Sequence, residues 1–237
     1  MWLVRLPVLV GSVVSVFLVS AAIGVWSAET GRRRIQAVFK PLTTILLLAV
    51  VGGPGGRFAW LIDIGIVFSL AGDVALLSAT RPAFLAGLAS FLIAHLSYTA
   101  AFVLVSWTAL CHDAPGGWAV TVGAALVMGA VTVVLLRKLW PGTAGLRGPL
   151  VGYSIALAAM VVGAVGAAWI WARDPVGAGP PGALPTAALG AVAFYVSDAS
   201  LAVNRFARAI KHAPFLTLGL YWLGQLGIAL AARFATS

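Results

Sequence analysis

Charged residues are scarce in this chain of 237 residues. They make up 9% of it, whereas an ordinary soluble domain is roughly 25% charged. Hydrophobic residues make up 62%, which leaves too little polar surface to cover a water-soluble fold. The composition therefore excludes an ordinary soluble domain and indicates that the lipid bilayer is the main solvent.

The chain also has few of the side chains that build disulfides and metal sites. Its single cysteine, Cys111, cannot form an internal disulfide and has no CxxC or Cys/His partner nearby. Of three histidines, only His95 lies inside an apolar run, because His112 and His212 fall in predicted loops. A bound zinc ion takes about three or four side-chain ligands. We therefore expect no metal and no other cofactor, and the absence of a GxSxG sequence argues against a serine esterase.

Acidic residues are the rarest charged group. Six Asp and Glu stand against 15 Lys and Arg, which gives a net charge of +9. The basic residues lie at the ends of apolar runs and form no patch interleaved with aromatic residues, so we expect no nucleic-acid partner. Anionic lipid and membrane orientation account for them better.

Apolar runs long enough to cross a bilayer are abundant. A transmembrane helix needs about 20 mostly apolar residues, and we find eight candidates, of which the second is short. They cover residues 7–26, 38–52, 58–78, 83–106, 118–136, 148–171, 184–204 and 213–233. The connections are brief and contain Gly and Pro. We expect an all-α fold, a polytopic transmembrane helical bundle of about eight spans, in a single integral membrane domain over residues 1–237.

Lys and Arg are distributed unevenly between the two sets of connections. Those after the first, third, fifth and seventh spans hold eleven of the 15, and the other side holds four. Because short cytoplasmic loops carry the excess of Lys and Arg, we expect both termini outside and the basic loops in the cytoplasm. Twelve Arg against three Lys, with abundant Ala, Gly and Val, indicate a GC-rich bacterial gene and a bacterial cell membrane.

Four ionisable residues of four predicted spans meet in the cytoplasmic half of the membrane. They are Lys40, Asp73, His95 and Asp198. An ionisable side chain inside a bilayer is costly, and it usually faces the bundle interior for a functional reason. Asp63 lies apart, near the outer end of its span, and it is equally well explained as an interfacial residue.

Tyrosines and amides share helix faces with these groups, since residues three or four apart are neighbours on a helix. Tyr195 lies beside Asp198, Tyr98 beside His95, and Tyr221 beside Gln225. Structural explanations remain for each residue taken alone. His95 could bridge two helices by hydrogen bonds, and Lys40 could extend its amine to the headgroups. Their joint occurrence at one depth favours a site.

Two carboxylates in such a site suit acid-catalysed hydrolysis. In a medium of low dielectric constant they do not easily ionise together, so one keeps its proton and becomes a usable acid. Glycosidases use such a pair to stabilise an oxocarbenium-like transition state. A vinyl ether hydrolyses by a related route, in which protonation on carbon gives an oxocarbenium ion that water then attacks.

Six segments of the sequence resemble the YhhN family, whose animal members include lysoplasmalogenases. They are residues 40–41 (KP), 68–77 (FSLAGDVALL), 84–87 (FLAG), 91–98 (FLIAHLSY), 195–206 (YVSDASLAVNRF) and 221–225 (YWLGQ). The resemblance implies an eight-span membrane enzyme that cleaves the vinyl ether bond of lysoplasmalogens. The products would be a fatty aldehyde and glycerophosphoethanolamine or glycerophosphocholine.

Within the chain, residues 72–76 resemble residues 197–201, which is compatible with a parallel 4+4 repeat of the spans.

We therefore predict a lipid hydrolase, with a lysophospholipid or another lipid as substrate, and leave homo-oligomerisation open. The predicted catalytic residues are Asp73, Asp198, His95, Tyr98, Tyr195 and Tyr221. The predicted substrate-binding residues are Lys40, Asn204, Arg205, Ser197 and Gln225. The alternative is a proton-coupled membrane transporter that uses Asp73, His95 and Asp198 as a relay. A lipid-binding protein without catalysis ranks third.

Overall fold

The computed structural model describes residues 2–52, 56–110, 116–173 and 183–235, which excludes Cys111 and His112. Within these ranges the chain forms helices and no strand, and eight helices are long and apolar enough to cross a membrane. They are α1 (Trp2–Glu29), α2 (Arg33–Val51), α3 (Arg57–Ala75), α4 (Arg81–Leu110), α5 (Gly117–Leu139), α6 (Arg147–Arg173), α7 (Ala183–Phe206) and α8 (Leu220–Ala235). The predicted all-α polytopic bundle is confirmed. The 4+4 repeat and the extent of the single domain stay predictions.

Two short elements interrupt the long helices. The 3-10 turn η1 (Trp140–Gly142) follows α5, and the π-helical turn η2 (Phe215–Gly219) leads into α8. Helix α2 begins at Arg33, five residues before the start predicted at residue 38. Its first turn contains arginines, which an apolar run does not include. Apolar runs therefore located the spans but underestimated the helical turns at the membrane surface.

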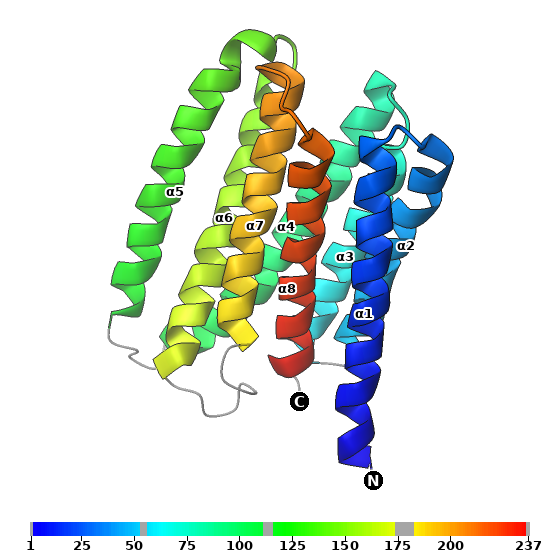
Figure 1. Cartoon of the computed structure of the whole chain (residues 1–237). Coiled ribbons are helices and arrows are strands. Elements are labelled where there is room, and N and C mark those ends of the chain that lie inside the picture. The colour runs from blue at the N-terminus through cyan, green and yellow to red at the C-terminus, as the bar shows by residue number, and fades with distance from the viewer. Residues whose placement is uncertain (1, 53–55, 111–115, 174–182, 236–237) are drawn as a thin grey trace.

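Helices that follow one another in the chain run in opposite directions, and their basic connections share one end of the bundle (Figure 1). The connections α1–α2, α3–α4, α5–α6 and α7–α8 lie at one end, and α1 begins and α8 ends at the other. Helix α8 packs against α7, α2 and α3, while α4 packs against α3 and α6. The alternation of connections agrees with the sequence. Which end faces the cytoplasm stays a prediction.

Glycine permits a close backbone contact between α7 and α8. A Cβ on Gly190 would come within 2.5 Å of the carbonyl oxygen of Gly224, and one on Gly224 within 2.6 Å of the carbonyl oxygen of Gly190. Small residues are enriched at such contacts because helices in lipid associate through close packing. This contact fixes α8 against α7, so the side chains of both helices are presented to the same interior space.

Helix α5 differs from the other spans in its packing. Only 6% of its membrane-spanning window is buried, against 61% for α6. In Figure 1, α5 lies at the edge of the bundle and covers α6. Most of α5 therefore faces lipid, and the groups buried in the bundle come mainly from the other helices.

Candidate active site

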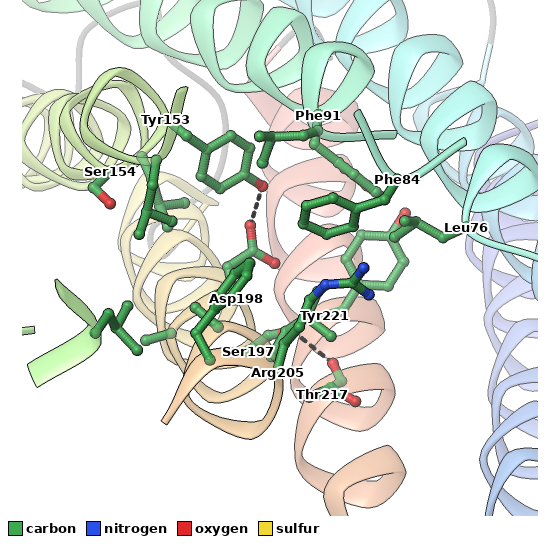
Figure 2. A pocket seen from close by; sticks show the side chains of 18 of the residues that line it. Leu76, Phe84, Phe91, Tyr153, Ser154, Ser197, Asp198, Arg205, Thr217 and Tyr221 are labelled. Carbon is green, nitrogen blue, oxygen red and sulfur yellow. Dashed lines mark hydrogen bonds between the residues drawn. The ribbon is translucent and has the colours of Figure 1, made fainter. Parts of the chain in front are cut away.

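A pocket of about 120 Å³ lies inside the bundle, and its lining residues near the ends of α3 and α7 place it toward the basic connections. Its polar part includes Lys40 of α2, Asp73 of α3, Tyr153 of α6, Asp198 of α7 and Tyr221 of α8. The apolar part of its lining, called the apolar arm below, includes Leu135 and Leu139 of α5 and Leu150 and Leu157 of α6. The pocket thus joins ionisable groups to a surface suited to hydrocarbon. Figure 2 shows it from close by.

Asp73 is enclosed by hydrogen-bond donors from two other helices. Its carboxylate lies 3.3 Å from Lys40 Nζ through Oδ1, and Oδ2 accepts hydrogen bonds from Thr44 (2.5 Å) and Tyr221 (2.8 Å). Lys40 and Asp73 are both buried, with side-chain exposures of 7% and 1%. A buried charge is tolerated when it is paired and hydrogen-bonded, so Lys40 is fixed beside Asp73 rather than extended to the headgroups.

Only one carboxylate oxygen of Asp198, Oδ2, makes hydrogen bonds to the described residues. Tyr153 donates a hydrogen bond to its Oδ2, drawn as a dashed line in Figure 2, and His95 Nε2 lies 3.3 Å from the same oxygen. His95 Nε2 is also 3.0 Å from the Tyr153 hydroxyl. Among the described residues, Oδ1 of Asp198 has no hydrogen-bond partner, and in Figure 2 it points into the pocket. Asp198 therefore offers a free oxygen to a bound molecule.

His95 is fully buried, and its ring packs edge-on against an aromatic neighbour. The ring centroids of His95 and Phe194 lie 4.8 Å apart, and Nδ1 has no hydrogen-bond partner among the described residues. Nε2 therefore makes the polar contacts of the ring, to Tyr153 and Asp198, while Nδ1 makes none among the described residues.

Aromatic rings separate the Asp73 and Asp198 groups. Phe194 also packs edge-on against Tyr221 at 5.1 Å, and Tyr221 packs against Phe91 at 5.8 Å. A Cβ on Gly72 would come within 2.6 Å of the Phe91 ring, so glycine leaves the room that this ring occupies. The rings keep the two carboxylates apart while both reach the same pocket.

Arg205 lies at the exposed edge of the pocket. Its guanidinium carbon is 3.8 Å from the centroid of the Phe84 ring, a cation–π contact. Among the described residues no carboxylate pairs with it. Nearby, Ser197 Oγ donates to the backbone carbonyl of Thr217 in the π-helical turn η2, at 2.6 Å. Ser197 thus anchors α8 to α7, and Arg205 keeps donors available for an anion.

The structure separates the predicted residues into two sets. Asp73, Asp198, Tyr221, Lys40, Ser197 and Arg205 line the pocket, and His95 reaches it through Asp198. The other four do not line it. Tyr98 and Gln225 bond to each other behind Tyr221, Tyr195 lies 3.1 Å from Thr132 of α5, and Asn204 accepts a hydrogen bond from the backbone of Ile210. The functional role of every one of them stays a prediction.

Tyr153 is a pocket residue that the sequence missed, as are Ser154 and Thr217. Tyr153 lies on α6, within a span where no motif was recognised. The available signal was the pair of adjacent hydroxyl residues Tyr153 and Ser154 in a mostly apolar helix, and tyrosine in a span is more readily explained as an interfacial residue. Only the packing of α6 against α4 and α7 reveals that it bridges His95 and Asp198.

Two further predictions from the sequence concern metal binding and the place of Asp63. Within the described residues no group of three or more His, Cys, Asp or Glu side chains could hold a metal ion. Asp63 has one buried carboxylate oxygen, Oδ1, without a hydrogen-bond partner among the described residues, and it does not line the pocket. Asp63 is therefore not part of this site.

Fold and pocket together define a polytopic integral membrane protein with two buried carboxylates around a partly apolar pocket. The chain belongs to the YhhN family, whose model matches residues 35–232. The matched region contains α3, α4, α7 and every polar pocket residue described above. The resemblance seen in the sequence is thereby confirmed.

Relatives come from animals and bacteria. The chain is 27% identical to human lysoplasmalogenase TMEM86A over 178 residues, covering 72% of this chain and 64% of that protein. It is 28% identical to mouse lysoplasmalogenase TMEM86B over 200 residues, covering 84% and 75%. It is 34% identical to a lysoplasmalogenase of Mycobacterium bovis over 187 residues, covering 76% and 63%. No solved structure matches this chain significantly.

Proposed function

We propose that this protein is a membrane-embedded hydrolase that cleaves the vinyl ether bond of lysoplasmalogens. The observation that carries the proposal is that Asp73 and Asp198, from α3 and α7, line one pocket with an apolar arm. Acid chemistry on a lipid needs a proton donor, an ionised partner and room for a hydrocarbon chain. Relatives named lysoplasmalogenase support the choice of substrate.

Asp198 is the proton donor in this proposal. Its Oδ1 faces the pocket without a partner among the described residues, so a proton on that oxygen would point at a bound substrate. Tyr153 and His95 hold Oδ2 and so fix the direction of the carboxyl group. His95 acts as an orienting donor rather than a proton carrier, because its Nδ1 lies in apolar surroundings.

Asp73 is the ionised carboxylate. Lys40, Thr44 and Tyr221 all present donors to it, and each favours the charged form. A fixed negative charge in a site of low dielectric constant stabilises the positive charge that develops on the substrate. Lys40, predicted from the sequence as a substrate-binding residue, instead acts in this proposal as the partner of Asp73.

The reaction balances without a cofactor. The acid Asp198 transfers its proton to the vinyl carbon farther from the ether oxygen, and the ether oxygen shares the positive charge that develops on the carbon bonded to it, as an oxocarbenium ion. Water adds to the adjacent carbon and returns a proton to the Asp198 carboxylate. The hemiacetal then collapses, its hydroxyl proton passing to the departing oxygen, to give a fatty aldehyde and a glycerophospho-headgroup alcohol.

The pocket edges accommodate the two ends of such a substrate. Arg205 has donors available for the lipid phosphate at the end with the basic connections. The leucines of the apolar arm, from α5 and α6, accept the alkenyl chain. The positive-inside distribution of Lys and Arg would place this site in the cytoplasmic leaflet of a bacterial cell membrane.

The decisive experiment measures free fatty aldehyde by mass spectrometry after the purified, detergent-solubilised protein is incubated with lysoplasmenylethanolamine. The Asp198→Asn variant, checked for folding by its elution from a sizing column, is the control. Aldehyde from the parent and not from the variant supports the proposal. If folded parent protein releases no aldehyde but moves protons across liposome membranes, the proton-coupled transporter replaces it.

A further inference from the structure

Two chains of hydrogen bonds reach Asp73 Oδ2 from behind the pocket. In the first, the Tyr98 hydroxyl donates to Gln225 Oε1 (2.6 Å), and Gln225 Nε2 donates to the Tyr221 hydroxyl (3.4 Å). Tyr221 in turn donates to Asp73. In the second, Trp222 Nε1 donates to the Thr44 hydroxyl (3.4 Å), which donates to Asp73. Both chains end on the same carboxylate oxygen.

The second chain has its direction fixed by the chemistry of tryptophan. The indole N–H is a donor and never an acceptor, and a threonine hydroxyl carries one hydrogen. Because Thr44 accepts from Trp222, its own hydrogen is free for Asp73, where the distance is only 2.5 Å. Trp222 is 1% exposed and does not line the pocket.

The first chain has its direction fixed by the two ends of an amide. Tyr98 occupies the carbonyl oxygen of Gln225, so the NH₂ group faces Tyr221. The Tyr221 oxygen then accepts, and its hydrogen goes to Asp73. If the amide turned over, its oxygen would accept from Tyr221 and Asp73 would lose that donor. Tyr98 and Gln225 are fully buried, so no bulk water can substitute.

We propose that Tyr98, Gln225 and Trp222 are positioning residues that fix the direction of both chains and thereby keep Asp73 an ionised acceptor. None of the three touches the pocket, and each acts through Tyr221 or Thr44. The kinetic consequence rests on the proposed function, whereas the protonation state of Asp73 does not. An experiment can therefore contradict the proposed function without contradicting the protonation state proposed for Asp73, and the reverse.

Infrared spectroscopy tests the protonation state directly, through the carbonyl stretch of a protonated carboxyl group. Tyr98→Phe and Trp222→Phe each remove one donor from a different chain, and Gln225→Met removes the amide at similar length. We expect each variant to gain a protonated-carboxyl band in addition to the one that the proposed acid Asp198 gives in the parent. The additional band must disappear when Asp73→Asn is added, which assigns it to Asp73.

Kinetics on lysoplasmenylethanolamine give the second readout. We expect Tyr98→Phe to lower kcat by about fivefold, the scale of one lost hydrogen bond, with KM unchanged. Tyr98→Phe added to Gln225→Met should lower kcat no further, because both lie in one chain. Ser106→Ala is the matched control, since it removes another buried hydroxyl of α4, one that donates to the Phe102 carbonyl.

Each outcome has one meaning. New bands that depend on Asp73 support the proposal even if the parent proves inactive on this lipid, in which case only the proposed function fails. No new band in folded Tyr98→Phe and Trp222→Phe overturns the proposal. Additive losses of kcat for Tyr98→Phe and Gln225→Met, or an equal loss in Ser106→Ala, overturn it too.

Discussion

The surroundings of Asp73 and Asp198 differ although both residues line one pocket. Asp73 is 1% exposed, has a lysine at 3.3 Å and uses both oxygens in contacts with donors. Asp198 is 12% exposed, uses only Oδ2, and has no Lys or Arg partner among the described residues. One carboxylate is fully enclosed by protein, and the other is held from one side.

The difference shows how a membrane protein can give two identical side chains separate tasks. Their position along the bundle does not distinguish them, since Asp73 lies near the end of α3, Asp198 lies near the end of α7, and both line one pocket. The partners do, because a carboxylate surrounded by donors is stabilised in its charged form, whereas one with a free oxygen can present a proton. We therefore expect the two residues to respond differently to the same substitution.

The largest effect is expected for Asp198→Asn. An amide cannot deliver a proton to carbon, and a positioned general acid contributes roughly 10²- to 10⁴-fold to rate. We expect kcat to fall by that amount while the thermal unfolding midpoint in detergent changes little, because among the described residues no Lys or Arg pairs with Asp198. Aldehyde release measured by mass spectrometry checks the rate. Full turnover in this variant would remove Asp198 from the chemistry.

Asp73→Asn should combine a smaller loss of activity with a loss of stability. Removing the fixed charge is expected to lower kcat by roughly 10²-fold. It also leaves Lys40 buried without its partner, which costs about 3–5 kcal/mol for a buried pair. Thermal unfolding in detergent, followed by circular dichroism, measures the second effect.

The double variant Asp73→Asn/Lys40→Met separates the two contributions. It removes the buried cation as well, so most of the stability should return while activity stays low. If activity returned together with stability, Asp73 would be a structural residue, and the contrast with Asp198 would lose its chemical meaning.

Tyr153→Phe sharpens the Asp198 side of the comparison. It removes the hydroxyl that donates to Oδ2 and leaves His95 as the remaining donor. We expect a loss in kcat of about tenfold, the scale of one hydrogen bond to a charged or strongly polarised group, with KM and the unfolding midpoint nearly unchanged. An unchanged kcat would mean that His95 alone orients Asp198.

The sequence predicted the spans and the two carboxylates because their signals are local. A run of about 20 apolar residues identifies a helix in lipid, and an acid within such a run stands out by its cost. Asp73, His95 and Asp198 were found in this way, and the family resemblance points to the same segments. Tyr153 was missed because a tyrosine inside a span carries no comparable cost.

Other residues were found without their correct setting because helix rotation cannot be read from spacing alone. Tyr195 and Asp198 are three residues apart on α7, yet Tyr195 faces Thr132 of α5 while Asp198 faces the pocket. Tyr98 follows His95 by three residues and meets Gln225 instead of the pocket. Which part of a polar stripe reaches a cavity depends on how neighbouring helices pack, here α5 and α8.

Arg205→Gln should give the smallest effect, and it should act on binding. The guanidinium is exposed at the pocket edge, where a charge contact with a phosphate contributes about 1 kcal/mol or less. We expect KM to rise by about threefold to fivefold, with kcat unchanged, because neither carboxylate touches Arg205. Arg208→Gln is the matched control, since Arg208 is an exposed arginine just beyond the end of α7 and does not line the pocket.

An equal rise in KM for both variants would assign the effect to the overall positive charge of this surface. A fall in kcat for Arg205→Gln would instead connect this residue to Asp198, and the separation of binding from chemistry at the pocket edge would be wrong.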